Sequence, residues 1–253
     1  MISVEDALTQ VLALVKPLDV EHVPLRQAAG RVLARDVAAA RTQPPFAASS
    51  MDGYAVRRAE VEPDAMFKVV GEAAAGHRYP GTIRAGQAVR IFTGAPVPGG
   101  ADFIVIQEDV TRRGDLITLG RDIGPKDNIR PAGVDFKEGA PLKAPRTLGA
   151  ADIALLASMN IPTVPVARKP VVALISTGDE LVVPGEVPGP DQIIASNTYG
   201  LAAMLEDHGA IPRILPISRD SETSLRAAFT LARGADLVIT IGGASVGDHD
   251  LVA

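Results

Sequence analysis

The chain has 253 residues, of which 47% are hydrophobic and 22% charged, a balance that predicts one or two folded domains with a substantial core. Its net charge of −5 argues against binding to a nucleic-acid backbone, which requires clustered positive charge. The chain has no cysteine, which excludes disulfides and thiolate metal sites, and it shows neither a signal-peptide pattern nor a membrane-spanning run, so we expect a cytoplasmic protein with no nucleic acid or membrane as partner.

The first two thirds of the chain predict a short helix followed by a β-rich module. Ser3 and Asp6 form a capping-box pattern, and apolar residues follow at helical spacing until Pro17. Thr147 is placed to cap a second helix over residues 148–159. Between these helices, short β-rich runs separated by Gly and Pro turns predict strands at residues 67–70, 88–92, 103–107 and 116–119.

After Pro170 the pattern changes to alternating strands and helices. The expected helices cover residues 196–208 and 221–233, and the expected strands cover residues 171–176, 213–217 and 236–241. This order predicts a doubly wound parallel sheet, so the fold class of the whole chain is α/β plus β, in several domains. Ligands of such sheets bind outside the carboxyl ends of the strands.

Two motifs follow predicted strands of this sheet. Residues 176–181, Ser-Thr-Gly-Asp-Glu-Leu, place the carboxylates of Asp179 and Glu180 beside a glycine, which fits either a Mg²⁺ or polar-ligand site or an ordinary turn. Residues 242–250, Gly-Gly-Ala-Ser-Val-Gly-Asp-His-Asp, predict a phosphate-binding loop, because its backbone N–H groups are free to face a ligand. The two aspartates of this loop, Asp248 and Asp250, are candidate ligands for the accompanying Mg²⁺.

Three other polar residues near this edge also have structural explanations. Asn197 and Asp220 stand where two predicted helices begin, so helix capping explains them as well as a site role does. His249 has no second His or Cys at metal-ligand spacing, and we interpret it as an exposed loop residue.

Three loops of the β-rich module each place a carboxylate or a hydroxyl beside a glycine. They contain Asp52 in SMDGYAV, Thr93 and Gly94 in FTGAPVP, and Asp135 in NIRPAGVD. Each loop alone is typical of a turn. Three of them in one module favour a shared functional role.

Together these motifs resemble the molybdopterin molybdenumtransferase family, the bacterial MoeA proteins and the E domain of gephyrin. The resemblance implies that molybdate is inserted into adenylated molybdopterin and AMP is released, in a Mg²⁺-dependent step of molybdenum cofactor synthesis. The segments that carry it occur in the family's order: SMDGYAV, FTGAPVPGGAD, NIRPAGVD, ISTGDEL, SNTYGLAAMLEDHGA and GGASVGDHD.

The resemblance also implies a division into three domains and an assembly. Residues 1–20 and 170–253 would form the sheet domain, similar to that of molybdopterin adenylyltransferases. Residues 21–40 and 139–169 would form a connecting domain, and residues 41–138 an inserted β-barrel-like domain. The implied assembly is a homodimer with the site shared between subunits, and molybdopterin adenylyltransferase is a further candidate partner.

Carried over to this sequence, the resemblance assigns roles to three groups of residues. The metal-binding residues would be Asp250 and Glu180. The catalytic residues would be four carboxylates: Asp52, Asp135, Asp179 and Glu180. The cofactor-binding residues would be polar side chains and glycines: Thr93, Gly94, Asp220, Gly242, Gly243, Ser245 and Gly247.

The sequence departs from the family pattern in three places. Ala47 and Ala48 stand where many members have Asp and Asn, and Val134 stands where many have an acid. Family chains also continue through more of the sheet into a C-terminal β domain, so we expect this chain to be an incomplete member that self-associates through an unpaired sheet edge. Two other hypotheses are a molybdopterin adenylyltransferase, against which the β module argues, and a non-catalytic dimerisation or scaffold fragment.

Overall fold

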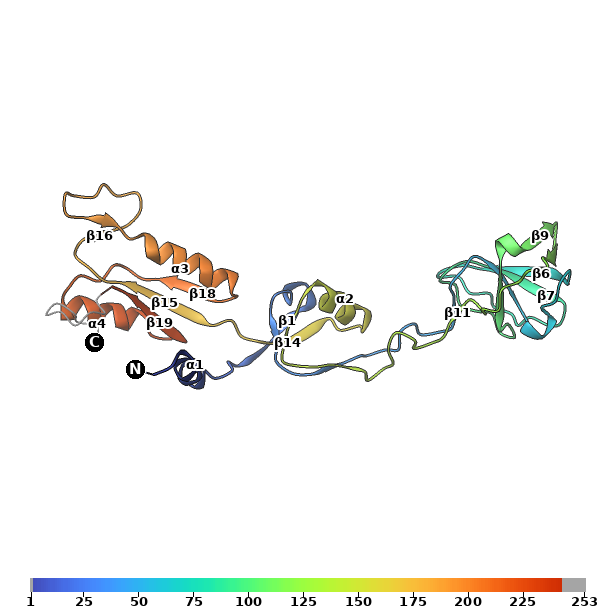
Figure 1. Cartoon of the computed structure of the whole chain (residues 1–253), viewed down its shortest axis with the longest axis horizontal. Coiled ribbons are helices and arrows are strands. Elements are labelled where there is room, and N and C mark those ends of the chain that lie inside the picture. Colours follow the sequence, from blue (N-terminus) through green and yellow to red (C-terminus); the bar gives the residue numbers. More distant parts are fainter. Residues whose placement is uncertain (1, 243–253) are drawn as a thin grey trace. The chain divides into compact units, whose positions relative to one another are not determined.

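The structure is a computed structural model in which residues 2–242 are described (Figure 1). No helix among these residues is long and apolar enough to cross a membrane. The chain divides into two compact units. Unit 1 comprises Met1–Arg35, Ala144–Ile153 and Thr163–Ala253, and unit 2 comprises Asp36–Lys143 and Ala154–Pro162.

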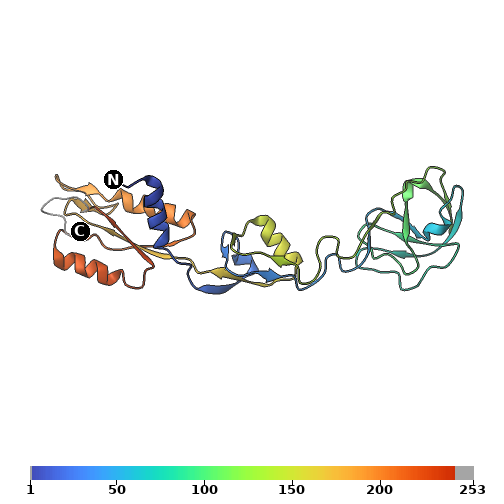
Figure 2. The same ribbon diagram turned by 60° about the horizontal axis from the view of Figure 1, so that its bottom comes forward.

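Unit 1 contains a three-stranded parallel sheet in the order β18-β15-β19. Alternate side chains of the central strand pack on opposite faces, because successive residues of a strand point to opposite sides. Val172 and Leu174 pack with helix α3, whereas Ala173 and Ile175 pack with helix α4. Figure 2 shows the two helices on opposite sides of the sheet. These elements are β15 (Val171–Ser176), β18 (Ile211–Ile214), β19 (Leu237–Ile241), α3 (Ser196–Asp207) and α4 (Glu222–Leu231).

The expected parallel sheet with helices on both faces is therefore confirmed. The second predicted strand in chain order is displaced. β18 occupies Ile211–Ile214, whereas the sequence pattern indicated residues 213–217. Pairing with β15 begins at Val171 opposite Ile211, and Pro216 has no N–H with which to continue the ladder.

Unit 1 also contains a four-stranded antiparallel sheet, two smaller strands and helix α1 (Val4–Ala13). Ser3 caps the helix as predicted, because its Oγ accepts a hydrogen bond from the Asp6 N–H at 3.0 Å. The Asp6 carboxylate accepts from the Ser3 hydroxyl at 2.7 Å and not from the Ser3 N–H, so the second bond of a capping box is not formed among the described residues. The remaining elements of this unit are β1 (Val20–Pro24), β2 (Val32–Leu33), β13 (Arg146–Thr147), β14 (Thr163–Ala167), β16 (Leu181–Val182), β17 (Ile193–Ile194) and the 3-10 helix η1 (Leu25–Gln27).

Helix α2 (Ala150–Ser158) begins differently from the prediction. Thr147 lies in β13, paired with Val32, so its expected role as the helix cap is wrong. The Asp152 carboxylate instead accepts a hydrogen bond from the Gly149 N–H at 2.9 Å. A carboxylate in the first turn stabilises the start of a helix by accepting from the N–H of the residue before the helix and by its favourable interaction with the helix dipole.

Unit 2 is built on a six-stranded sheet in the order β8-β5-β7-β6-β10-β9. Only β6 and β7 run parallel within it; the other neighbours are antiparallel. The larger strands of the sheet are β5 (Gly53–Val56), β6 (Met66–Ala73), β7 (Gln87–Ile91), β8 (Phe103–Ile106), β9 (Val110–Arg113) and β10 (Leu116–Leu119). The smaller elements are β3 (Val37–Ala38), β4 (Ala48–Ser49), β11 (Ile129–Arg130), β12 (Pro141–Leu142), η2 (Arg58–Glu60) and η3 (Gln107–Asp109).

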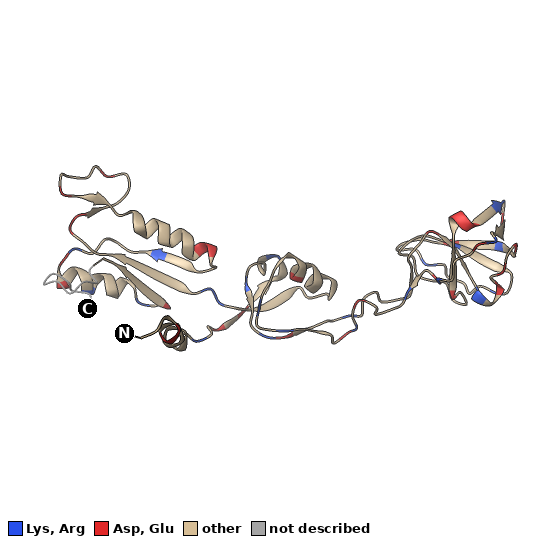
Figure 3. Ribbon diagram, in the orientation of Figure 1, with Lys and Arg blue, Asp and Glu red and all other residues tan. Residues whose placement is uncertain are grey.

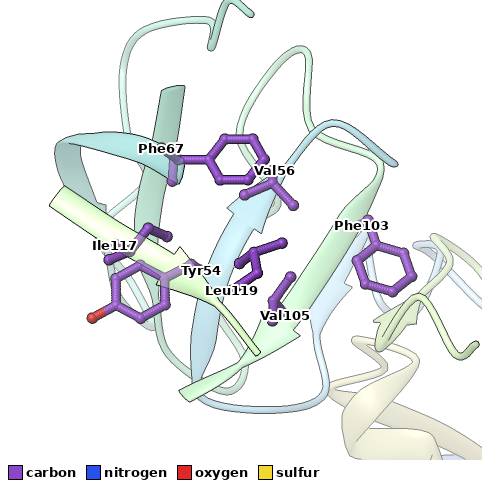
Figure 4. Close-up of a cluster of buried hydrophobic side chains, with 8 residues drawn as sticks. Tyr54, Val56, Phe67, Phe103, Val105, Ile117 and Leu119 are labelled. Carbon is purple, nitrogen blue, oxygen red and sulfur yellow. The ribbon is translucent and has the colours of Figure 1, made fainter. Parts of the chain in front are cut away.

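The sheet of unit 2 buries apolar side chains on both of its faces. Tyr54 and Val56 belong to one cluster and the intervening Ala55 to the other, as strand alternation requires. Figure 4 shows the first cluster, in which Tyr54, Val56, Phe67, Phe103, Val105, Ile117 and Leu119 converge. The expected β-rich module and the multi-domain α/β plus β fold class are confirmed; the finer division into three domains stays a prediction.

Candidate functional site

The first group of predicted site residues lies at one corner of the unit 2 sheet. Asp52 directly precedes β5, and Thr93 follows β7 closely. These strands pair with Gly53 opposite Ile91, which brings the two residues together. Asp52 Oδ1 accepts hydrogen bonds from the Thr93 N–H at 2.8 Å and from the Thr93 hydroxyl at 2.9 Å. The Thr93 N–H and hydroxyl lower the pKa of the Asp52 carboxyl, because both donors favour its charged form.

Gly53 is required at this corner by close packing of backbone. A Cβ atom on Gly53 would lie 2.0 Å from the Val105 carbonyl oxygen of β8. The Asp-Gly pair was compatible with simple turn chemistry, but the structure places Gly53 as the first residue of β5, paired with Ile106. The glycine therefore lets Asp52 approach β8 and β7 closely.

The three loops that the sequence analysis singled out meet at strand β4. The Gly94 N–H donates to the Ser49 carbonyl at 2.8 Å, and Gly94 has the positive φ of +81° that favours glycine. On its other side β4 pairs with β11, which belongs to the Asp135 loop. The β4 backbone therefore joins the Thr93–Gly94 loop to the Asp135 loop.

Asp135 itself is engaged elsewhere within this cluster of loops. Its carboxylate forms an ion pair with Arg130 at 2.6 Å. Among residues 2–242, no hydrogen bond or ion pair links Asp135 to Asp52 or Thr93. The structure thus brings the three loops together but not the three side chains.

Arg90 is a functional candidate that the sequence analysis missed. It lies on β7 next to the Asp52–Thr93 pair, and its positive charge also lowers the pKa of Asp52. Its guanidinium carbon lies 5.1 Å from the ring centre of Tyr54 and 4.7 Å from that of Phe92. Only the pairing of β5 with β7 reveals this arrangement, because Tyr54 and Arg90 are far apart in sequence.

The second group of predicted residues lies at the carboxyl edge of the parallel sheet in unit 1. The Thr177 N–H donates to the Ile241 carbonyl at 3.0 Å, and the Ser218 N–H donates to the Ser176 carbonyl at 2.8 Å. The segments that follow β15, β18 and β19 are therefore held together at one edge, where parallel sheets bind ligands.

Gly178 and Gly242 allow this edge to pack closely. Gly178 has a φ of +145°, and the Glu180 carboxylate folds back to the position that a Cβ atom of Gly178 would occupy. Gly242 has a φ of +96°, and a Cβ atom there would lie 2.8 Å from the Thr177 carbonyl oxygen. Both glycines are conformationally required.

The carboxylates Asp179 and Glu180 are exposed at this edge. Asp179 Oδ1 accepts a hydrogen bond from the backbone N–H of Asp220 at 3.3 Å. Neither Asn197 nor Asp220 is a helix cap, contrary to that interpretation: Ala195 precedes α3 without a side-chain cap, and Ser221 caps α4 by accepting from the Ser224 N–H. Asp220 instead connects its loop to the Ser-Thr-Gly-Asp-Glu-Leu segment through its backbone.

Arg219 is the second functional candidate that the sequence analysis missed. Its Nη1 donates to the carbonyl oxygens of Asp179, Leu181 and Gly178 at 2.9, 3.3 and 3.5 Å. One guanidinium thus holds the backbone of the segment that carries the two predicted catalytic carboxylates. The contacts span about 40 residues of sequence, and an arginine in a loop gives no sequence signal for them.

Metal ligands were predicted at Glu180 and Asp250. Among residues 2–242, no group of three His, Asp or Glu side chains is arranged to hold a metal ion. The predicted ligand Asp250 lies outside the described residues, as do Gly243, Ser245, Gly247, Asp248 and His249.

A cavity of about 230 Å³ in unit 2 is lined by Arg58, Phe103 and neighbouring residues and contains none of the predicted site residues. Basic and acidic residues are interspersed in both units, as Figure 3 shows.

Comparison with protein families decides the affiliation of the chain. Residues 2–160 match the family described as MoeA N-terminal region (domain I and II), and residues 173–253 match a probable molybdopterin binding domain. The chain belongs to the MoeA family. The resemblance inferred from the motifs is thereby confirmed.

Relatives of this MoeA-family chain are similar over nearly its whole length. It is 40% identical to a molybdopterin molybdenumtransferase of Nostoc sp., with 100% of this chain and 60% of the relative covered. It is 36% identical to the enzyme of that name from Haemophilus influenzae, with 99% and 63% covered. A solved MoeA structure from Pyrococcus horikoshii is 33% identical and superposes with a TM-score of 0.83, covering 95% of this chain and 63% of that one. This chain therefore spans less than two thirds of the length of these relatives.

Proposed function

We propose that this chain acts in molybdenum cofactor synthesis as a molybdopterin molybdenumtransferase, inserting molybdate into adenylated molybdopterin with release of AMP. Relatives that carry this name are 40% and 36% identical over nearly the whole chain. The observation that carries the proposal is the edge of the parallel sheet, where Gly242 and the Asp179–Glu180 segment lie together in a domain of the molybdopterin-binding family.

The two groups of residues supply complementary chemistry for this reaction. Molybdate and a phosphate anhydride are both negatively charged, so their approach requires cationic groups and hydrogen-bond donors. Arg90 and Arg219 provide positive charge in their respective groups. By its sequence, the glycine-rich segment that begins at Gly242 would provide backbone N–H donors. The Thr93 donors lower the pKa of Asp52 and so favour its charged form, which suits the carboxylate to accept hydrogen bonds from a polar group and to orient it.

The donor chemistry of the sheet edge fits Mg²⁺. This ion binds through one or two carboxylates together with substrate phosphates, so a preformed cluster of three protein ligands is not required. Glu180 and Asp250 are the residues we propose to hold it. When bound, Mg²⁺ supplies positive charge that offsets the charge of the phosphate and of the leaving AMP.

We further propose that the functional unit is a cytoplasmic homodimer in which both groups contribute to each site. Asp52, Thr93 and Asp135 would come from one subunit. Asp179, Glu180, Asp220 and the glycine loop would come from the other. The resemblance to the family, in which the site is shared between subunits, is the ground for this arrangement.

The deciding experiment measures AMP release from adenylated molybdopterin by the 253-residue chain in the presence of Mg²⁺, with and without molybdate. A full-length family member serves as the positive control. Molybdate-dependent AMP release is the expected result. Consumption of ATP with formation of adenylated molybdopterin would identify an adenylyltransferase instead, and release by the control alone would overturn the proposed activity for this chain.

A further inference from the structure

Arg90 occupies an unusual position at the rim of the apolar cluster in unit 2. It is the cross-strand partner of Tyr54, and Phe92 lies two residues further along the chain from Arg90. The guanidinium lies over both rings, at 5.1 and 4.7 Å from their centres. Contacts of this kind hold a cation in place through the negative faces of the rings and do not neutralise it.

The hydrogen-bond partners of Arg90 are also neutral. Nη1 donates to the Gly53 carbonyl at 3.3 Å, and Nη2 donates to the Gln107 side-chain oxygen at 2.6 Å. Among residues 2–242 Arg90 forms no ion pair. Its Nε atom has no hydrogen-bond partner there and is not among the fully buried unpaired atoms, so this donor is unpaired and not completely buried.

The acids near Arg90 form no ion pair with it, although its charge acts on Asp52 at longer range. Glu72 is its Cα partner across the pairing of β6 with β7, yet the two side chains form no salt bridge. The Asp52 carboxylate oxygen Oδ1 is occupied by the two Thr93 donors. Arg130 and Arg121 of the same unit are, by contrast, paired with Asp135 and Asp64 at 2.6 and 3.1 Å.

We propose that Arg90 is an anion-binding residue that receives a tetrahedral oxyanion, either molybdate or the phosphate of the adenylated substrate. A guanidinium presents a planar fork of donors that matches the oxygens of such an anion. The rings of Tyr54 and Phe92 and the Gly53 carbonyl fix its orientation, so little side-chain entropy is lost on binding. This inference rests on the proposed function for the identity of the anion.

Binding of two probes to the 253-residue chain tests the proposal. The probes are sodium molybdate and AMP, each titrated calorimetrically against the wild type, Arg90→Gln, Arg90→Lys and the control Arg58→Gln. Arg58 is a matched control because it also lies 5.1 Å over a ring, that of Phe103, in the same unit, and Arg58→Gln removes the same charge. Circular dichroism and Tm establish that each variant is folded.

We expect Arg90→Gln to weaken binding of molybdate, or of AMP, by at least about tenfold, and Arg58→Gln to leave both within about twofold. The probe that responds identifies the source of the oxyanion. Should Arg90→Gln fail to fold, Arg90→Lys decides, because it retains the charge and loses the planar fork; weakening of about threefold or more supports the proposal. Three results would each overturn the proposal. The first is equal affinity of the wild type and the Arg90 variants, and the second is an equal loss of affinity in Arg90→Gln and Arg58→Gln. The third is that neither probe binds to the wild type.

The anion-binding role of Arg90 and the proposed transferase activity can fail independently of each other. Molybdate-dependent AMP release by the wild type, combined with unchanged binding in the Arg90 variants, would refute only the anion-binding role. Arg90-dependent binding of molybdate or AMP without any AMP release would refute only the transferase activity.

Discussion

At the scale of single residues, substitution of Asp52 tests directly whether the Asp52–Thr93 pair of unit 2 belongs to the functional site. Asp52→Asn removes the charge that two donors from Thr93 stabilise. We expect AMP release to fall by roughly 10²-fold, the usual cost of losing one group that stabilises a transition state. The matched control is Asp64→Asn, which removes an exposed carboxylate of the same unit that pairs with Arg121. Steady-state rates that are equal in the two variants would remove Asp52 from the site.

Arg219 offers a second test at this scale, in unit 1. Arg219→Ala removes donors to three backbone carbonyls, so amide hydrogen exchange at residues 178–182 should become roughly tenfold faster. A positioning role also predicts that KM for adenylated molybdopterin rises and that Arg219→Lys restores part of the loss. Arg226→Ala is the control, because Arg226 is an exposed arginine on α4 paired with Glu222. Unchanged exchange at residues 178–182 would show that Arg219 does not hold this segment.

At the scale of elements, an ion pair ties the start of the parallel sheet to the segment that precedes it. Arg168 donates to both oxygens of Asp236 at 2.8 and 2.7 Å, and the Val171 N–H donates to the same carboxylate at 2.8 Å. The Arg168 hydrogen bonds lower the pKa of Asp236 far below its ordinary value, and the Val171 N–H adds to this effect. β15 and β19 therefore begin at a shared electrostatic contact.

Asp236→Asn should lower Tm in a pH-dependent way. A carboxyl group whose folded-state pKa is depressed contributes stability above its unfolded-state pKa, and that contribution is lost as the pH falls through the folded-state value. We expect the Tm difference between wild type and variant to be full at neutral pH and to shrink below about pH 4. Asp191→Asn, at an exposed loop position, should show no such difference. Thermal unfolding between pH 7 and pH 2.5 provides the measurement, and a constant difference would exclude the ion pair as its cause.

The elements also show which parts of the fold were predictable. Strands β15 and β10 coincide with their predicted ranges, because buried strands have continuous or alternating apolar patterns and clear turns at their ends. The displaced β18 and the misassigned caps at Thr147, Asn197 and Asp220 depend on pairing registers and on competition between neighbouring polar residues. Such competition is decided by contacts that are distant in sequence.

At the scale of the whole molecule, the proposed dimer predicts complementation between two inactive variants. Asp52→Asn and Glu180→Gln impair different groups of residues, so a mixed dimer would retain one intact site if each site takes one group from each subunit. Co-refolding equal amounts of the two variants should restore roughly a quarter of wild-type AMP release, because half of the dimers are mixed and each has one site. The absence of recovery in a mixture shown to exchange subunits would contradict the shared site.

A second whole-molecule prediction concerns self-association. Among the described residues β19 pairs only with β15, and Leu237 at its start is 52% exposed. Helix α1 has no buried residue and exposes Val4, Leu8 and Leu12. Unpaired strand edges and exposed apolar faces favour association. We expect light scattering at rising concentration to detect species larger than the dimer, and Leu237→Lys to reduce them; a monodisperse dimer throughout would refute this expectation.

The amino-acid sequence by itself determined the affiliation of this chain and the location of its motifs. Glycines beside hydroxyls and carboxylates, such as Gly178 beside Asp179 and Glu180, are recognisable without coordinates because their order along the chain carries the signal. Apolar periodicity likewise determined the parallel sheet with helices on both faces, since burial on two faces requires continuous apolar strands.

Only the tertiary structure decided which side chains act on one another. The pairing of β5 with β7 places Arg90 over the Tyr54 ring and near Asp52, and the loop after β18 places Arg219 on the carbonyls of the Asp179 segment. The same pairings show that Asp135 shares a loop cluster with Asp52 while its carboxylate binds Arg130. An arginine side chain is long and flexible, so the partner of its guanidinium depends on strand register and loop packing, and neither leaves a trace in the local sequence.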